Sequence, residues 1–158
     1  MKGEHFSPDV QELVTIFGRH GVDFLLVGGE AVIFHGYPRV TGDVDLWYRQ
    51  DPDNVGRMFD ALSEFWEGKI PGITTAPELL ESGVIVQFGR PPNRIDLLST
   101  IDGVTFEEAW PERINETLAL PDGGRVPFPV IGLAALCKNK RASGRHKDLD
   151  DLEHLQRS

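Results

Sequence analysis

The apolar positions near the start of the chain follow two different periods. Between residues 8 and 18 they recur every three to four residues, which predicts an amphipathic helix, and Ser7-Pro8 has the composition of an N-cap followed by proline at the first helical position. Residues 24–27 then form a short continuous apolar run that predicts a buried strand. We expect a glycine turn at 28–29 and a short helix at 31–34 after it.

Polar and apolar positions alternate between residues 42 and 48. This period of two predicts a second strand, with Asp43 and Asp45 on one face and apolar side chains on the other. The elements expected farther along are a helix at 53–65, a loop at 68–77, strands at 84–88 and 94–98, a hairpin of 118–120 with 125–130, and C-terminal helices over about 131–156 that break at 143–144.

Length and composition agree with one globular domain covering residues 1–158. A chain of this length builds one core of ordinary size but not two, and 40% apolar with 26% charged residues is typical of folded proteins. The single cysteine, Cys137, excludes an internal disulfide, and the first residues lack the apolar stretch of a secretory signal. We therefore expect a cytoplasmic protein that does not enter the membrane.

The net charge of −9 predicts a surface that repels phosphate groups over most of its area. One short stretch departs from this, because residues 138–147 bring five cations together. Any contact with nucleic acid or with a triphosphate is expected there. The cations of this basic segment are Lys138, Lys140, Arg141, Arg145 and Lys147.

The two aspartates of the second strand suggest a metal site. Carboxylates at i and i+2 project the same way, roughly 6 to 7 Å apart at about 3.3 Å per residue, and a divalent cation relieves their repulsion. Asp96 lies between two apolar residues of a predicted strand and is the candidate third ligand, ahead of Asp102 and Glu81. An oxygen-rich site of this kind favours Mg²⁺ and phosphate chemistry. The alternative for Asp96 is a salt bridge to Arg94 or Arg90.

The glycine turn suggests a phosphate site beside that metal. Gly28 and Gly29 have no β-carbon, so phosphate oxygens can approach the backbone closely at the start of the following helix. Either signal alone is weak, because a glycine pair after a strand is usually only a tight turn. The combination is more specific.

These residues resemble the nucleotidyltransferase superfamily typified by DNA polymerase beta. Its pattern is an apolar residue, two small residues, a spacer of about a dozen residues and then acidic–apolar–acidic–apolar, which residues 26–31 and 39–46 reproduce. Within the superfamily the chain is similar to minimal prokaryotic members related to the AbiE-type toxins of toxin–antitoxin systems. That likeness includes Arg39 and Thr41 before the aspartates and the stretch 139–152 near the C-terminus.

The resemblance implies an α/β (α+β) fold with a mixed sheet flanked by helices. It also implies Mg²⁺ bound by Asp43, Asp45 and Asp96, and a nucleoside triphosphate over the two glycines. By the same analogy Lys140 would bind the triphosphate, with Arg141 or Arg145. The acceptor would be a hydroxyl group of a tRNA, a protein or a small molecule, and a cognate toxin or antitoxin would be a partner.

Several of these residues have structural alternatives. Arg39 and Thr41 would either steady a phosphate or tie their loop to the acidic cluster, and the basic segment would otherwise be a solvated face with helical ion pairs. For the whole protein, the alternative function is a catalytically inactive nucleotide-binding or partner-binding component of a toxin–antitoxin system.

Overall fold

A four-stranded mixed sheet forms the centre of the computed structural model, which describes residues 1–157. The strand order is β1-β2-β4-β3. β1 (Phe24–Val27) is antiparallel to β2 (Asp43–Tyr48), β2 is parallel to β4 (Arg94–Leu98), and β4 is antiparallel to β3 (Ile85–Phe88). This architecture confirms the expected α/β class with a mixed sheet.

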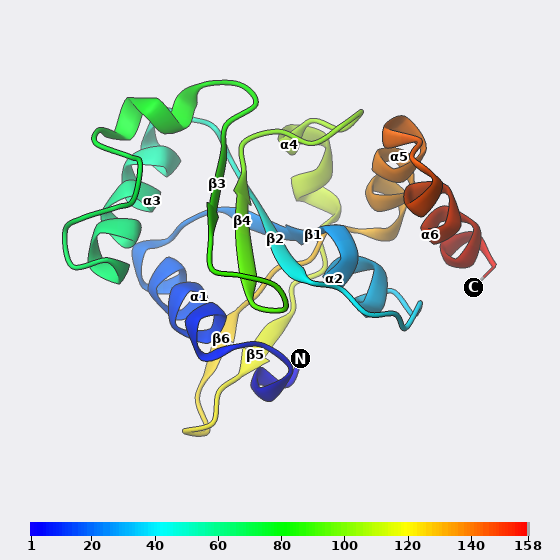
Figure 1. Ribbon diagram of the computed structural model, residues 1–158, viewed down its shortest axis with the longest axis horizontal. Coiled ribbons are helices and arrows are strands. Elements are labelled where there is room, and N and C mark those ends of the chain that lie inside the picture. Colours follow the sequence, from blue (N-terminus) through cyan, green and yellow to red (C-terminus); the bar gives the residue numbers. More distant parts are fainter. Residues whose placement is uncertain (158) are drawn as a thin grey trace.

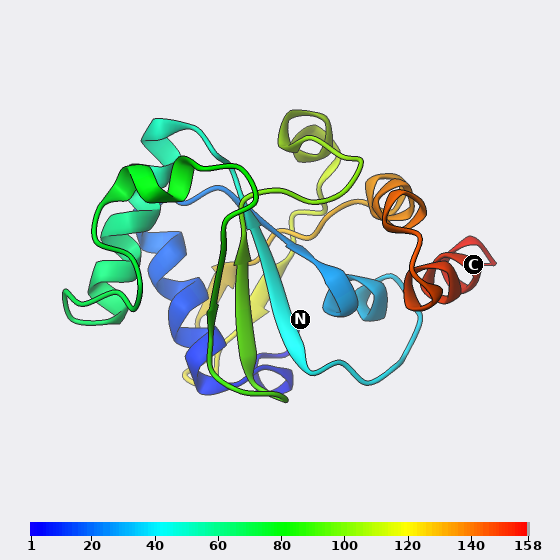
Figure 2. The ribbon, with the colours of Figure 1, turned by 45° about the horizontal axis from the view of Figure 1, so that its top comes forward.

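The helices divide between the two sides of this sheet, as Figure 1 and the turned view in Figure 2 both show. α1 and α3 pack against each other on one side, and α5 and α6 form a pair on the other side, beyond α2. Their bounds are α1 (Pro8–His20), α2 (Gly28–Phe34), α3 (Pro52–Phe65), α5 (Leu133–Ser143) and α6 (His146–Gln156).

Local sequence signals explain where α1 and α3 begin and end. The Ser7 hydroxyl accepts a hydrogen bond from the backbone of Val10, and Asp51 caps α3 in the same way through Asn54. Gly21 ends α1 in the left-handed conformation, with φ of 67°, which glycine adopts without steric cost. The apolar faces of both helices are buried in the core, which confirms the two predicted helices.

An extended segment beyond β1 connects the sheet to the C-terminal helices. The Leu26 N–H donates to the Pro129 carbonyl at 2.8 Å, and the Ile131 N–H donates to the Leu26 carbonyl at 3.1 Å. Val130 thereby lies parallel to β1, two residues before the cap of α5. The outer edge of β1 is covered by this segment, and α5 is held beside the end of β1.

The remaining elements lie around this frame. The hairpin of β5 (Thr117–Ala119) and β6 (Arg125–Pro127) is a separate two-stranded sheet. The short helices are η1 (Gly3–His5), η2 (Ala76–Leu80), α4 (Phe106–Ala109) and η3 (Trp110–Glu112). Within residues 1–157, helices both long enough and apolar enough to cross a bilayer are absent.

Two sequence-based expectations about elements were wrong in detail. α2 begins at Gly28 itself, so the predicted turn at 28–29 is the first turn of the helix. β6 is shorter than the strand expected at 125–130, because only residues 125–127 form the ladder with β5. Phe128 and Val130 continue the hydrogen bonds to residues 116 and 114, and 129–131 also pair with β1 on the other edge. Pro127 and Pro129 have no N–H to donate, which fits an irregular strand. α4 and the three short 3₁₀ helices were not predicted.

Candidate active site

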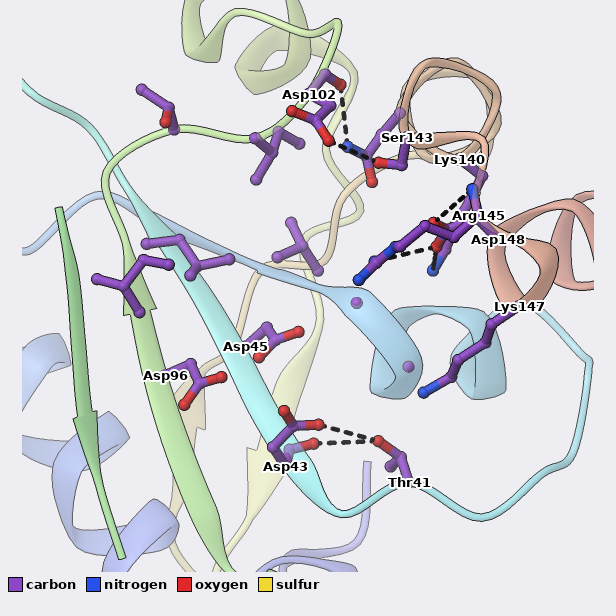
Figure 3. Close-up of a pocket in the computed structure, with 18 of the residues that line it drawn as sticks. Thr41, Asp43, Asp45, Asp96, Asp102, Lys140, Ser143, Arg145, Lys147 and Asp148 are labelled. Atoms are coloured by element: carbon purple, nitrogen blue, oxygen red, sulfur yellow. Dashed lines mark hydrogen bonds and ion pairs between the residues drawn. The ribbon is translucent and has the colours of Figure 1, made fainter. Parts of the chain in front are cut away.

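A cavity of about 490 Å³ opens on the side of the sheet that faces α5 and α6 (Figure 3). Its lining includes nine of the residues that the sequence singled out for metal or nucleotide binding, although these come from four separate parts of the chain. Those residues are Gly28, Gly29, Arg39, Thr41, Asp43, Asp45, Asp96, Lys140 and Arg145. We call this space the central cavity.

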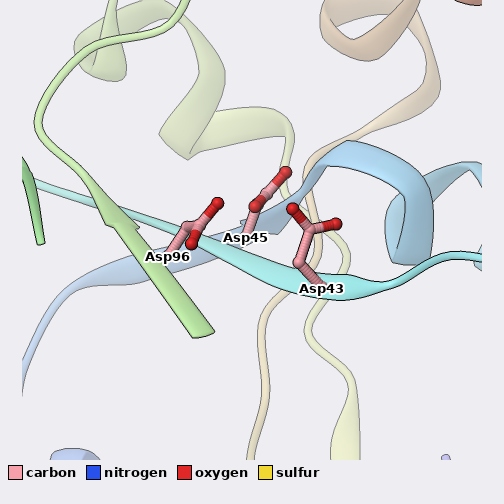
Figure 4. A group of neighbouring side chains, drawn as sticks. All are labelled: Asp43, Asp45 and Asp96. Atoms are coloured by element: carbon pink, nitrogen blue, oxygen red, sulfur yellow. The ribbon is translucent and has the colours of Figure 1, made fainter. Parts of the chain in front are cut away.

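Three carboxylates share one end of the central cavity because of the register between β2 and β4. Asp43 and Asp45 point to the same face of β2, and Asp45 lies directly beside Asp96 in the parallel pairing. Figure 4 shows the three side chains pointing toward one another above the strands. Each offers an oxygen within 4.8 Å of the others, so the three can share one metal ion.

Arg94 lies among these carboxylates. It is paired with Asp43 across the strands and precedes Asp96 by two positions, so its side chain is on the same face. Its guanidinium donates from Nη2 to Asp43 Oδ2 at 2.6 Å, and from Nε and Nη2 to the two Asp96 oxygens at 3.0 and 3.1 Å. The salt bridge considered as the alternative for Asp96 is therefore present, together with the three-carboxylate cluster.

Asp45 is the carboxylate that is most difficult to ionise. Burial, together with the negative charges of Asp43 and Asp96, raises its pKa to about 7, against a smaller opposing effect of Arg94. The bridging hydrogen bonds from Arg94 go to the other two carboxylates. The cluster therefore has excess negative charge at Asp45, which is the condition that a bound cation would relieve.

The two glycines are required by the side chains that pack on them. Gly28 has a φ of 66°, and a β-carbon there would collide with the Asp45 carboxylate. A β-carbon on Gly29 would lie 2.7 Å from the Thr41 hydroxyl oxygen. The glycine pair thus lets the start of α2 approach the carboxylates, a packing reason that the sequence alone did not indicate.

Arg39 and Thr41 connect the loop before β2 to its surroundings. The Thr41 hydroxyl donates to the Asp43 carbonyl at 3.3 Å and to its carboxylate at 3.4 Å. Arg39 forms an ion pair with Asp151 of α6, with 2.8 Å between Nε and Oδ1. Both side chains therefore tie the loop to acidic groups, as one of the two sequence-based alternatives proposed, and both still line the central cavity.

Lys140 is buried rather than solvated. Its side chain is 6% exposed, and its ammonium lies 3.2 Å from Asp148 Oδ1 and 3.0 Å from Asp151 Oδ2. The alternative of a solvated basic face is therefore wrong for this residue, because α6 folds back on α5 and supplies two carboxylates. Lys140, Asp148, Asp151 and Arg39 form one ionic network that joins α5, α6 and the loop before β2.

Arg145 and Lys147 provide the accessible positive charge of the central cavity. Arg145 is 77% exposed, although its Nε lies 2.7 Å from Asp148 Oδ2. Figure 3 shows both side chains reaching from the start of α6 into the space opposite the carboxylates. Arg141 lies outside the cavity lining. The cavity thus has an anionic end on the sheet and a cationic end on the helices.

Asp148 and Asp151 are contributors to this site that were not assigned a role in it from the sequence. The two aspartates stand at i and i+3 on α6, on the side that also carries Leu152 and Leu155, and both are fully or almost fully buried. Acidic residues aligned with an apolar helix face are a signal that could have indicated a buried partner for Lys140.

Trp47 and His35 have structural roles. The Trp47 indole is 2% exposed and its N–H donates to the Ser99 carbonyl at 3.3 Å, so it lies in the core, outside the lining of the central cavity. His35 Nε2 lies 2.8 Å from the Ile131 carbonyl. Among the described residues, the only cluster suited to a metal is the three aspartates.

Comparison with known proteins gives only a distant structural likeness. No family model matches the chain, and no curated protein is significantly similar to it. A solved structure described as an antigenic nucleotidyltransferase-like protein from Paracoccidioides brasiliensis aligns over 95% of this chain and 77% of its own, with 16% identity and a TM-score of 0.49. Because the identity and the TM-score are both low, any function has to be inferred from the cavity itself.

Proposed function

We propose that this protein is a metal-dependent nucleotidyltransferase, which moves a nucleoside monophosphate from a nucleoside triphosphate to a hydroxyl acceptor. The observation that carries this proposal is the central cavity, in which three carboxylates able to share a cation lie opposite two accessible cations. A triphosphate is the ligand whose charge suits both ends, since it binds a divalent ion and basic side chains at once.

Asp43, Asp45 and Asp96 would hold Mg²⁺. Their donors are all carboxylate oxygens, which this ion prefers. A bound cation would also favour the ionised form of Asp45, whose pKa is raised by burial and by its two acidic neighbours. When bound, the ion would supply charge neutralisation on the reacting phosphate and would lower the pKa of the acceptor hydroxyl. Arg145 and Lys147 would bind the outer phosphates at the other end.

The reaction balances as an in-line displacement. The acceptor oxygen forms a bond to the α-phosphorus while the bond from that phosphorus to the bridging oxygen breaks, and pyrophosphate leaves. Asp96, beside Asp45 on the adjacent strand, would accept the hydroxyl proton. Lys140 would help to position Arg145 rather than contact the triphosphate, since Asp148 binds both cations.

The resemblance seen in the sequence suggests a more specific role. We propose that the protein is a cytoplasmic toxin–antitoxin component with a cognate partner, and that its acceptor is a tRNA, a protein side chain or a small molecule. An RNA acceptor would have to approach along the basic segment 138–147, because the net charge of −9 opposes RNA elsewhere.

A label-transfer experiment tests the reaction. The protein is incubated with Mg²⁺, total tRNA or cell extract, and each nucleoside triphosphate labelled at either the α- or the γ-phosphorus. We expect α-label in the acceptor and γ-label in pyrophosphate. Asp43→Asn and Asp45→Asn should abolish transfer, whereas Asp60→Asn, an exposed change on α3, should not. Transfer of γ-label would contradict nucleotidyl transfer.

A nucleotide-binding protein without turnover is the second candidate. One observation favours it: Arg94 already neutralises Asp43 and Asp96, so the carboxylate cluster is partly compensated by the chain itself. In that case the variants would lose nucleotide binding, and neither label would leave the triphosphate.

A further inference from the structure

The guanidinium of Arg94 uses the carboxylate oxygens that a metal ion would need. Its three hydrogen bonds go to Oδ2 of Asp43 and to both oxygens of Asp96. These residues are two of the three in the cluster that can share an ion. A divalent cation and this guanidinium would therefore compete for the same lone pairs.

The position of Arg94 allows this competition to be reversible. Its side chain is 33% exposed and lines the central cavity, so it is accessible to solvent on the cavity side. An arginine has a long, flexible side chain, and the cavity that Arg94 lines has a volume of about 490 Å³. Asp43 and Asp96, in contrast, are fixed by the pairing of β2 with β4.

Electrostatics explain why the chain carries a cation at this point. Three carboxylates that converge within 4.8 Å repel one another, and a fixed positive charge between two of them lowers that cost. The hydrogen bonds from Arg94 go to Asp43 and Asp96 and not to Asp45. The guanidinium thus neutralises part of the negative charge of the cluster, and a divalent cation would neutralise more of it.

We propose that Arg94 is a built-in counter-ion which holds Asp43 and Asp96 together when no metal is bound, and which divalent metal must displace. This inference rests on the metal site of the proposed function. The consequence is a metal affinity set by the chain itself: Arg94 lowers the affinity of the carboxylates for a free ion while preserving their arrangement.

Binding of Mn²⁺ alone, followed by the electron paramagnetic resonance signal of the free ion at 150 mM salt, tests this exchange. Arg94→Gln removes the charge and should bind Mn²⁺ about tenfold more tightly than the unmodified protein, since each charged hydrogen bond lost to the competitor favours the ion. Arg94→Lys keeps the charge but not the fork that reaches both carboxylates, and should show a smaller increase. Arg90→Gln, an exposed change in the preceding loop, controls for net charge.

Thermal unfolding gives a second readout on the same proteins. In EDTA, Arg94→Gln should melt at a lower temperature than Arg90→Gln, and addition of Mn²⁺ should raise its melting temperature by more. If Arg94→Gln does not fold, Arg94→Lys carries the test, because it must still bind Mn²⁺ more tightly than the unmodified protein.

The outcomes separate this inference from the proposed function. Equal Mn²⁺ affinity in Arg94→Gln, Arg94→Lys and Arg90→Gln would overturn the counter-ion role while leaving the metal site intact. If none of the proteins binds Mn²⁺, both the counter-ion role and the metal site are wrong. Tight binding in Arg94→Gln with weak binding in the unmodified protein supports both.

Discussion

Asp45 combines burial with two neighbouring negative charges, and its pKa is raised from 3.8 to about 7. At a pH between these two pKa values, the folded protein holds a proton at Asp45 that the unfolded chain has released. The contribution of Asp45 to the free energy of unfolding therefore falls as the pH rises from about 4, and its full cost is present above about pH 7.

Asp45→Asn should remove this pH dependence. In EDTA, the variant should gain stability relative to the unmodified protein between pH 4 and pH 7, and the difference should stay constant at higher pH. Urea unfolding at several pH values measures it. With Mg²⁺ present the order should reverse at pH 8, because only the unmodified protein binds the ion through this carboxylate. A difference in stability that does not change with pH would contradict the assignment.

Gly28 should tolerate no larger residue. In Gly28→Ala the added methyl group would collide with the Asp45 carboxylate at a backbone conformation, φ of 66°, that disfavours alanine. We expect a loss of about 1 kcal/mol or more in unfolding free energy and a loss of Mn²⁺ binding. Gly36→Ala is the matched control, since Gly36 also has positive φ but nothing within 4 Å. It should lose stability and keep its affinity for Mn²⁺.

At the scale of single residues, the sequence predicted positions better than contacts. The alternation along 42–48 placed Asp43 and Asp45 on one face, because the period of a strand fixes side-chain direction. The pairing of Asp45 with Asp96 and of Asp43 with Arg94 depends on the register between two strands, and this register is set by tertiary packing. The pattern of residues within one strand does not determine this register.

The α5–α6 pair is the element whose stability depends most on buried charge. Asp151 is fully buried and contacts both Lys140 and Arg39, so it connects the pair to the loop before β2. Removal of one partner leaves cations buried without compensation, which is strongly unfavourable.

Asp151→Asn should therefore destabilise the protein by about 3 kcal/mol in unfolding free energy. Glu153→Gln is the matched control on the same helix. It breaks an exposed i,i+4 pair with Arg157 and should cost less than about 1 kcal/mol. Urea denaturation of the three proteins measures both values. Equal effects of the two substitutions would show that the buried network does not stabilise α6.

At the scale of elements, apolar periodicity located the central strands and the long helices to within a few residues. It did so because each presents one apolar face, or two for β1, to a single core. The burial of Lys140 could not be predicted in this way. The two carboxylates that make it possible come from α6, whose return onto α5 is a tertiary contact.

Charge is distributed unevenly over the whole molecule. The chain has a net charge of −9, and yet Arg145 and Lys147 place accessible positive charge at one end of the central cavity. Long-range attraction of a triphosphate is therefore weak, and its binding depends on local contacts.

Arg145→Gln should weaken binding of a nucleoside triphosphate about tenfold, the effect expected from loss of one charge-assisted hydrogen bond. Arg141→Gln changes the net charge equally but lies outside the cavity lining, and it should leave the affinity nearly unchanged. Isothermal titration calorimetry with a triphosphate and Mg²⁺ compares the two. If both variants lose affinity equally, net charge rather than a contact in the cavity determines binding.

In the proposed function, the carboxylate end and the cationic end of the central cavity bind a metal–triphosphate complex together. A crystal structure with Mn²⁺ and a triphosphate analogue that cannot release pyrophosphate tests it most directly, because anomalous scattering locates the ion. We predict an ion coordinated by Asp43, Asp45 and Asp96, with Arg94 turned away and the phosphates reaching Arg145. Manganese bound elsewhere, or a triphosphate whose α-phosphate lies away from the three carboxylates, would contradict the account.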